Sequence, residues 1–124
     1  ARRLIEEHNL PATVEATTDR RAALDGSDFV VITFQVGGLE AYNLDVEIPR
    51  RYGLDQTVGD TLGPGGVFRG LRTAAALDLI IADMHEVCPE ALIINYANPM
   101  SINCWHTSDS STGVRTFYRS CVRR

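Results

Sequence analysis

DFVVITFQ, at residues 28–35, is a nearly continuous run of β-branched and aromatic residues. A run of this kind is typical of a parallel strand that is buried on both faces of a sheet. A second run, ALIINYA at residues 91–97, has the same character. Between the two, apolar residues recur at steps of three and four from Val67 to Cys88, which predicts one long amphipathic helix that ends at Pro89. Two such strands joined by helical crossovers predict an α/β fold with a parallel sheet.

Weaker patterns supply the remaining elements. They predict a helix over 1–9, a short strand over 13–17, brief helices over 20–24 and 41–52, a glycine-rich loop over 53–66, and a helix from Pro99 through Trp105. We therefore expect a partial doubly wound, Rossmann-like sheet within residues 1–106. Residues 107–124 have no clear period and are expected to form a divergent or disordered tail.

Composition and charge limit the possible functions. The 124 residues, 44% hydrophobic and 23% charged, suffice for one soluble globular domain. No lysine occurs, which excludes a P-loop lysine and a Schiff-base lysine within this chain. The net charge of −4 argues against nucleic acid as a partner, and the longest apolar run, residues 29–34, is too short to span a membrane. Three widely spaced cysteines without a CxxC pair favour reduced thiols and a cytoplasmic location.

Ligands of open α/β sheets bind beyond the carboxyl ends of the strands, so the loops after the two runs are the candidate sites. After the first run come Val36, Gly37 and Gly38, and adjacent glycines let a flat or phosphorylated ligand approach the backbone closely. An ordinary turn explains these glycines equally well. After the second run, Asn98 precedes Pro99, which favours an extended backbone and an amide directed toward the crevice. Turn formation alone is again the alternative.

The glycine-rich block GPGGVFRG at residues 63–70 is not a dinucleotide fingerprint, because GxGxxG must follow a strand directly. It predicts instead a helix N-terminus beside Arg69 and Arg72, where an anion or sugar hydroxyls could bind. Asp60, at the head of this block, is either a turn or N-cap residue or a catalytic carboxylate. The three histidines are too scattered to predict a metal site, and no G-x-S-x-G elbow is present.

Three longer motifs resemble family 4 of the glycoside hydrolases, and most of all its α-galactosidase branch. They are DFVVITFQVGG at 28–38, GDTLGPGGVFRGLRT at 59–73 and HEVCPEALIINYANPMSINCW at 85–105. The likeness extends from about Thr13 to Trp105. It implies a Rossmann-like domain that binds NAD, and dependence on a divalent metal, usually Mn²⁺. Enzymes of this family are the NAD-dependent exception among glycosidases.

The resemblance also implies a mechanism and residue roles. NAD⁺ takes hydride from C3 of the sugar, and the ketone acidifies the C2 proton. A tyrosine removes that proton while the metal stabilises the enediolate; the aglycone then leaves from C1, water adds and NADH returns the hydride. By motif, Val36 and Gly37 lie against NAD, and Asn98 binds sugar hydroxyls near the metal. Asp60 matches the acidic position that raises the basicity of the tyrosine, with Arg69 and Arg72 supporting its loop.

Departures from the family pattern imply that the chain is a fragment that is inactive alone. The pyrophosphate-binding turn is expected before the first residue, and the base tyrosine and a histidine ligand beyond Arg124. Cys121 lies near the position of a metal-binding cysteine of the α-galactosidase branch, but no histidine follows it. Residues 39–44 lack the arginine of phospho-glycosidases, which favours an unphosphorylated galactoside. The full-length parent is expected to be a homo-oligomer.

Two alternatives remain at this stage. A lactate/malate-type dehydrogenase shares the fold and cofactor, but needs an arginine to bind a carboxylate and a His–Asp pair to move the proton. The second alternative is that the chain is a non-catalytic fragment that folds only partly.

Overall fold

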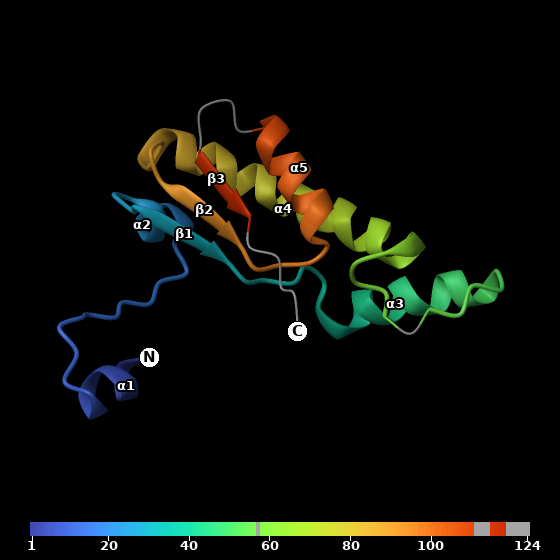
Figure 1. Cartoon of the computed structure of the whole chain (residues 1–124), viewed down its shortest axis with the longest axis horizontal. Coiled ribbons are helices and arrows are strands. Elements are labelled where there is room, and N and C mark those ends of the chain that lie inside the picture. The colour runs from blue at the N-terminus through green and yellow to red at the C-terminus, as the bar shows by residue number, and fades with distance from the viewer. Residues whose placement is uncertain (57, 111–114, 119–124) are drawn as a thin grey trace.

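The computed structural model describes residues 1–56, 58–110 and 115–118 (Figure 1). Helices and strands alternate along most of the chain, which confirms the predicted α/β class. In chain order they are α1 (Arg2–Glu7), α2 (Arg20–Leu24), β1 (Phe29–Ile32), α3 (Gly38–Arg51), α4 (Gly63–Val87), β2 (Leu92–Asn95), α5 (Met100–Ser110) and β3 (Arg115–Tyr118).

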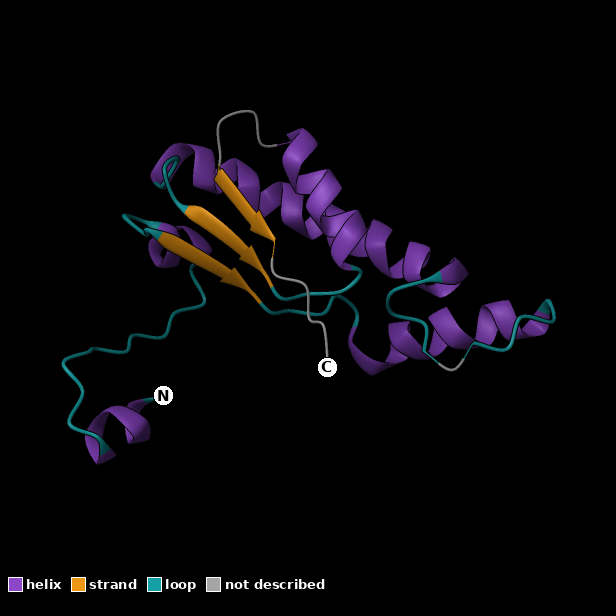
Figure 2. Cartoon of the chain, viewed as in Figure 1, coloured by secondary structure: helices purple, strands orange, loops and turns teal. Residues whose placement is uncertain are grey.

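The three strands form one parallel sheet in the order β1-β2-β3. Phe29 lies opposite Leu92, and Leu92 opposite Arg115. Crossovers between parallel strands are almost always right-handed, and here each strand is added on the same side of the previous one. Both crossovers therefore place their helices on the same face of the sheet, where α2, α4 and α5 lie (Figures 1 and 2). This arrangement is one half of a doubly wound sheet, as the partial Rossmann-like prediction requires.

The hydrophobic core lies between this face of the sheet and the helices α2 and α4. Its buried members come from α2, strands β1 and β2, α4 and the ends of the adjoining loops: Leu24, Ile32, Leu77, Ile81, Met84, Cys88, Ala91, Ile93 and Ala97. Within the described parts of the chain, no helix has the length and apolarity needed to cross a bilayer.

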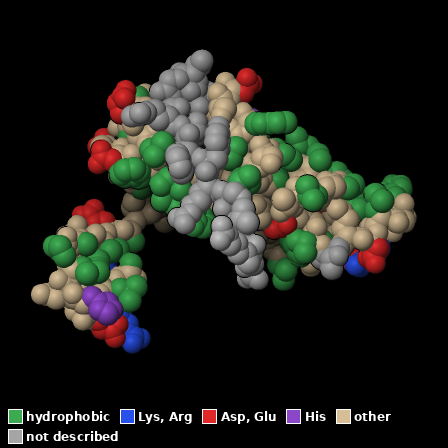
Figure 3. Space-filling view, in the orientation of Figure 1, with side chains coloured by type: hydrophobic (Ala, Val, Ile, Leu, Met, Phe, Trp, Pro, Cys, Tyr) green, Lys and Arg blue, Asp and Glu red, His purple; other side chains and the backbone are tan. Residues whose placement is uncertain are grey.

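Burial on both faces, predicted for the first strand, is wrong for β1. Ile32 is buried and Val30 half-buried, but the side chains that point the other way stay exposed, at 65% for Phe29 and 57% for Val31. The reason is the position of the helices, since α2, α4 and α5 cover only one face. The opposite face is turned toward the viewer in Figure 3, where apolar side chains are visible beside the grey atoms.

Helix α4 begins at Gly63, four residues before the predicted start at Val67. The last residues of the predicted loop therefore form the first turn of the helix. Pro64 occupies one of the first helical positions, where its missing N–H has no intrahelical partner in any case. Glycine and proline, normally helix breakers, are here compatible with a helix start.

Two further predictions differ from the structure. Residues 13–17 form no strand, and within the described residues β1 pairs with β2 alone. A tail is predicted from residue 107 onward, but helix α5 continues to Ser110. Residues Arg115–Tyr118 then form strand β3, which pairs in parallel with β2. A four-residue strand without alternation gives too little periodicity to be predicted from sequence.

Helix α2 is attached to α4 by charged side chains. Asp83 accepts hydrogen bonds from Arg20 Nε at 2.5 Å and from Arg21 Nη1 at 3.0 Å, and Glu86 accepts from Arg21 Nη2 at 2.6 Å. The hydrogen bond from Arg20, helped by the bond from Arg21 and by both positive charges, lowers the pKa of Asp83 against the opposing effect of burial. Because the folded pKa is lowered, this carboxylate stabilises the fold fully above its unfolded pKa, and the stabilisation is lost as pH falls through the folded value.

We predict that Asp83→Asn lowers the urea midpoint at pH 7, and that the difference from wild type shrinks below about pH 4, where carboxylates of unfolded chains protonate. Urea unfolding at pH 7 and pH 3 measures both effects. The exposed Glu90 supplies the control, since Glu90→Gln should leave the midpoint unchanged at pH 7. A difference for Asp83→Asn of equal size at both pH values would contradict the prediction.

Candidate functional site

The loop after β1 contains a glycine turn that leads directly into α3. Gly37 has a φ of 85°, in the left-handed region, and a Cβ there would lie 2.5 Å from the Ala41 Cβ. A Cβ on Gly38 would meet nothing within 4 Å, and no side chain caps the first turn of α3. The backbone N–H groups at this helix start are therefore open to an approaching ligand. Val36, predicted to lie against NAD with Gly37, is half-buried.

At the end of the neighbouring strand, the structure brings Asp60 and Asn98 together. The Asn98 Nδ2 donates to Asp60 Oδ2 at 3.1 Å, and the Thr61 hydroxyl donates to Asp60 Oδ1 at 2.7 Å. Both members of the pair are half-buried. Asp60 does not cap α4, because the N-cap residue is Leu62 and the side chain that bonds to this helix end is that of Gln56, whose Oε1 accepts from Gly65 N at 3.3 Å. The N-cap interpretation of Asp60 is thereby wrong.

Two arginines on α4 hold the surroundings of this pair. Arg69 Nε donates to the Asn98 backbone oxygen at 3.0 Å. Arg72 donates to both carboxylate oxygens of Asp45 on α3, with Nη1–Oδ1 at 2.8 Å and Nη2–Oδ2 at 2.5 Å. The hydrogen bond to Asp45 raises the pKa of Arg72 against the effect of burial. Arg72 therefore uses both of its terminal nitrogens within the protein, whereas Arg69 is held through Nε alone.

Asp45 is a residue that sequence reasoning missed. Its side chain is only 1% exposed, and it pairs with an arginine 27 positions later in the chain. A polar residue inside a weakly periodic helix gives no local sign that it is buried. The Asp45–Arg72 pair lies next to the glycine turn, since a Cβ on Gly37 would lie 3.8 Å from Arg72 Nε.

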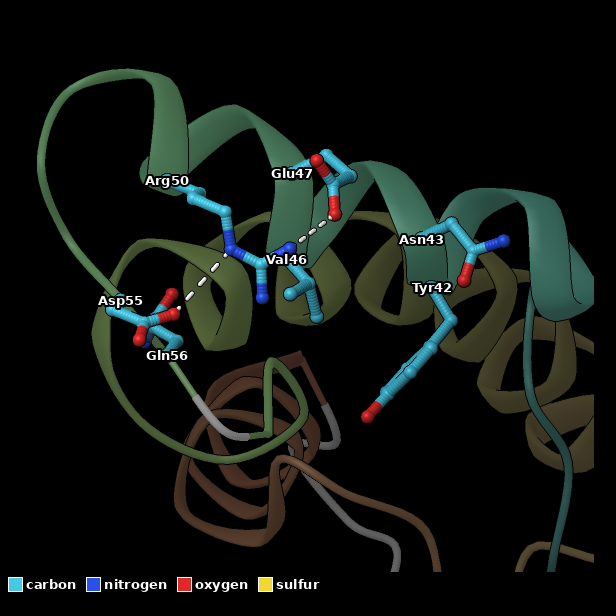
Figure 4. A pocket seen from close by; sticks show the side chains of 7 residues that line it. All are labelled: Tyr42, Asn43, Val46, Glu47, Arg50, Asp55 and Gln56. Carbon is cyan, nitrogen blue, oxygen red and sulfur yellow. Dashed lines mark hydrogen bonds and ion pairs between the residues drawn. The ribbon is translucent and has the colours of Figure 1, made fainter.

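A polar cavity of about 400 Å³ opens beside α3 and the loop that follows it (Figure 4). Arg50 crosses it, paired with Glu47 at 2.6 Å and Asp55 at 3.4 Å. The lining residues are Tyr42, Asn43, Val46, Glu47, Arg50, Asp55 and Gln56. None of the residues predicted from the motifs lines this cavity, so it is separate from the Asp60–Asn98 pair.

Metal ligands are not assembled in the part of the chain that the structure describes. No group of three His, Cys, Asp or Glu side chains comes together there. His106 lies on the surface between α5 and α4, with Nε2 2.6 Å from Asp78. Burial raises the pKa of the Cys88 and Cys104 thiols, which disfavours the thiolate that binds metals. Cys121, the doubtful candidate ligand, lies outside the described residues.

Fold and geometry together define an α/β domain whose parallel strands end at a glycine turn and at a polar Asp–Asn pair. Residues 1–118 match the pattern of the family 4 glycosyl hydrolases, and the chain belongs to this family. The motif resemblance noted from the sequence is thereby confirmed.

The similar proteins are glycosidases. The chain is 47% identical to an α-galactosidase of Rhizobium meliloti (strain 1021) over 104 residues, which are 83% of this chain and 21% of that enzyme. It is 46% identical to an α-glucosidase of Erwinia rhapontici, over 84% of this chain and 23% of the enzyme. The crystal structure of lplD, a Bacillus subtilis protein assigned as a glucosidase, superposes with a TM-score of 0.81 at 36% identity and covers 86% of this chain and 24% of its own. The chain thus spans about a fifth to a quarter of the length of these relatives.

We predict that Asp45→Asn destabilises the protein by about 3 kcal/mol, the lower end of the range for breaking a buried ion pair, because Arg72 keeps some contact with water. Urea unfolding compares this variant with Glu47→Gln on the same helix. The Glu47–Arg50 pair is exposed, so its loss should cost less than about 1 kcal/mol. Equal effects of the two substitutions would show that the buried pair contributes no more than an ordinary surface pair.

Proposed function

We propose that the whole protein that carries this chain hydrolyses unphosphorylated α-galactosides, with NAD and a divalent metal, usually Mn²⁺, as cofactors. The observation that carries the proposal is the hydrogen bond between Asn98 and Asp60. Residues assigned by motif to the sugar and to the base tyrosine, 38 positions apart in the chain, are thereby neighbours. Galactosidases among the similar proteins support the substrate class.

The glycine turn after β1 is compatible with a bound dinucleotide. Val36 and Gly37 would hold the cofactor, and the open side of Gly38 admits a ligand close to the backbone. NAD⁺, when bound, supplies the hydride acceptor. The residues of this turn would bind and orient it at the start of α3, where backbone N–H groups favour a negative ligand.

Asn98 and Asp60 have complementary parts in this proposal. Because the Asn98 Nδ2 donates to Asp60, the amide oxygen of Asn98 is left to accept a hydrogen bond from a sugar hydroxyl. The carboxylate of Asp60 adds negative charge beside the sugar, which favours proton acceptance by a base placed next to it. That base, a tyrosine, and the ligands of the metal would come from parts of the protein outside this chain.

A lactate/malate-type dehydrogenase receives less support from the described residues. Arg72 is already bound to Asp45 through both of its terminal nitrogens, so only Arg69, held through Nε to the Asn98 backbone oxygen, keeps terminal N–H groups that could bind a substrate carboxylate. A His–Asp pair exists, His106 with Asp78. However, Asp78 lies nine residues beyond Arg69, about 13 Å further along α4 and away from the strand ends.

The whole protein should release p-nitrophenol from p-nitrophenyl α-galactoside in the presence of NAD⁺, Mn²⁺ and a reductant. The 124-residue chain alone should give only background. NADH formation from lactate or malate serves as the control and should be absent. Oxidation of a hydroxy acid without glycoside turnover would replace the proposal by the dehydrogenase alternative, and purified activity of the short chain would disprove its expected inactivity.

Substitutions at the pair test the assigned roles. Asn98→Ala should lower kcat/KM at least roughly tenfold at unchanged NAD affinity, because a buried hydrogen bond to the sugar is lost. Asp60→Asn should slow exchange of the sugar C2 proton with deuterated solvent, while thermal unfolding stays close to wild type. Since the two side chains share one hydrogen bond, the double variant should lose less than the product of the single losses.

The outcomes that contradict these roles are distinct. Loss of NAD binding by Asn98→Ala with sugar turnover intact would reverse its assignment. An Asp60→Asn protein that unfolds while its folded fraction exchanges C2 at the normal rate would make Asp60 a structural loop residue.

A further inference from the structure

Strand β2 leaves the sheet just before Ala97. The last backbone bond to the neighbouring strand is from Tyr96 N to Ile32 O, at 2.8 Å. Ala97 is only 6% exposed, so its N–H and carbonyl must find partners within the protein. Asn95 supplies one for each group: its Oδ1 accepts from Ala97 N at 3.3 Å, and its Nδ2 donates to Ala97 O at 2.9 Å.

A second buried amide, from another element, binds the same carbonyl. Asn103 on α5 is 1% exposed, and its Nδ2 donates to Ala97 O at 3.2 Å. Its backbone N–H donates to Pro99 O at 3.0 Å. The orientation of both side-chain amides follows from chemistry, since only an NH₂ group can donate to a carbonyl. Asn95 and Asn103 thus hold the backbone on both sides of Asn98.

We propose that Asn95 and Asn103 are positioning residues that fix the Ala97–Asn98 turn and thereby set the direction of the Asn98 amide. Both are buried, so they act through Asn98 without contact to substrate. The hydrogen bond from Asn98 to Asp60 and that from Arg69 to Asn98 O each need this backbone in one place. The consequence for catalysis rests on the proposed function, whereas the consequence for the backbone does not.

The test in the whole protein uses Asn103→Leu, which keeps the branched shape of the side chain, though with bulkier ends, and removes the donor to Ala97 O. We expect kcat/KM for the galactoside to fall roughly tenfold, the loss typical of one misplaced hydrogen bond, at unchanged NAD affinity. In an Asn98→Ala background the same substitution should cause no further loss, because the group it positions is already absent. A merely structural role would lower activity in both backgrounds alike.

The matched control is Thr107→Val. The Thr107 hydroxyl is buried on the same helix and donates to Asn103 O at 2.6 Å, but it does not reach Ala97. Its removal deletes one buried hydrogen bond and should leave kcat/KM unchanged. If Asn103→Leu does not fold, Asn95→Ser replaces it, because serine can still accept from Ala97 N while the donor to Ala97 O is lost.

Hydrogen exchange provides a readout independent of activity. Amides of residues 95–98 should exchange faster in Asn103→Leu than in wild type, and at the wild-type rate in Thr107→Val. Unchanged exchange, or an activity loss that adds in full to that of Asn98→Ala, would overturn the proposal. An inactive wild-type protein would refute the proposed function instead, and exchange at residues 95–98 would then decide alone whether the two asparagines hold the turn.

Discussion

Three glycines on α4 allow this helix to lie directly against three other segments, and the candidate site depends on that contact. A Cβ on Gly65 would lie 2.5 Å from the backbone oxygen of Asp45 on α3. On Gly66 it would lie 2.7 Å from the backbone of Thr61, and on Gly70 2.8 Å from Ile102 on α5. A side chain at Gly65 or Gly66 would clash with backbone and push the helix away from α3 and from the loop that carries Asp60, whereas one at Gly70 would press on the side chains of Ile102 and Pro99, next to Asn98. The glycines therefore stabilise the fold through close packing, although their low helical propensity destabilises the helix itself.

The charges of the site follow from the same close packing. Asp45 is almost fully buried, and an unpaired carboxylate there would be strongly unfavourable. Arg72 and Arg69 are three residues apart on α4 and so lie on one face of the helix. From that face Arg72 reaches the carboxylate of Asp45, and Arg69 reaches the backbone oxygen of Asn98. One face of α4 thus connects α3, which follows the glycine turn, to the turn after β2.

The sequence was sufficient to predict the parallel α/β class, because unbroken β-branched runs and a long helical period are local signals. The sequence was insufficient to predict that GPGG at residues 63–66 forms the first turn of α4. Glycine and proline indicate a loop, and only the close packing of neighbouring segments explains them in a helix. The pairing of Asn98 with Asp60 and of Arg72 with Asp45 also has no local signal, because the partners are 38 and 27 positions apart. The motif resemblance pointed to Asp60 and Asn98, whose assigned roles stay predictions, and it missed Asp45, whose contribution is to packing and charge.

Asn95 and Asn98 illustrate why residue type alone does not define a site. Both belong to the same short motif and carry the same side chain. In Asn95 the oxygen and nitrogen of the amide are both bound to the backbone of Ala97, so no polar atom is left for a ligand. In Asn98 the nitrogen donates to Asp60, and among the residues that the structure describes the oxygen has no hydrogen-bond donor. Because the buried Asn95 satisfies the backbone where the strand ends, the half-buried Asn98 is held in a fixed position, from which its oxygen would bind the sugar of the proposed function.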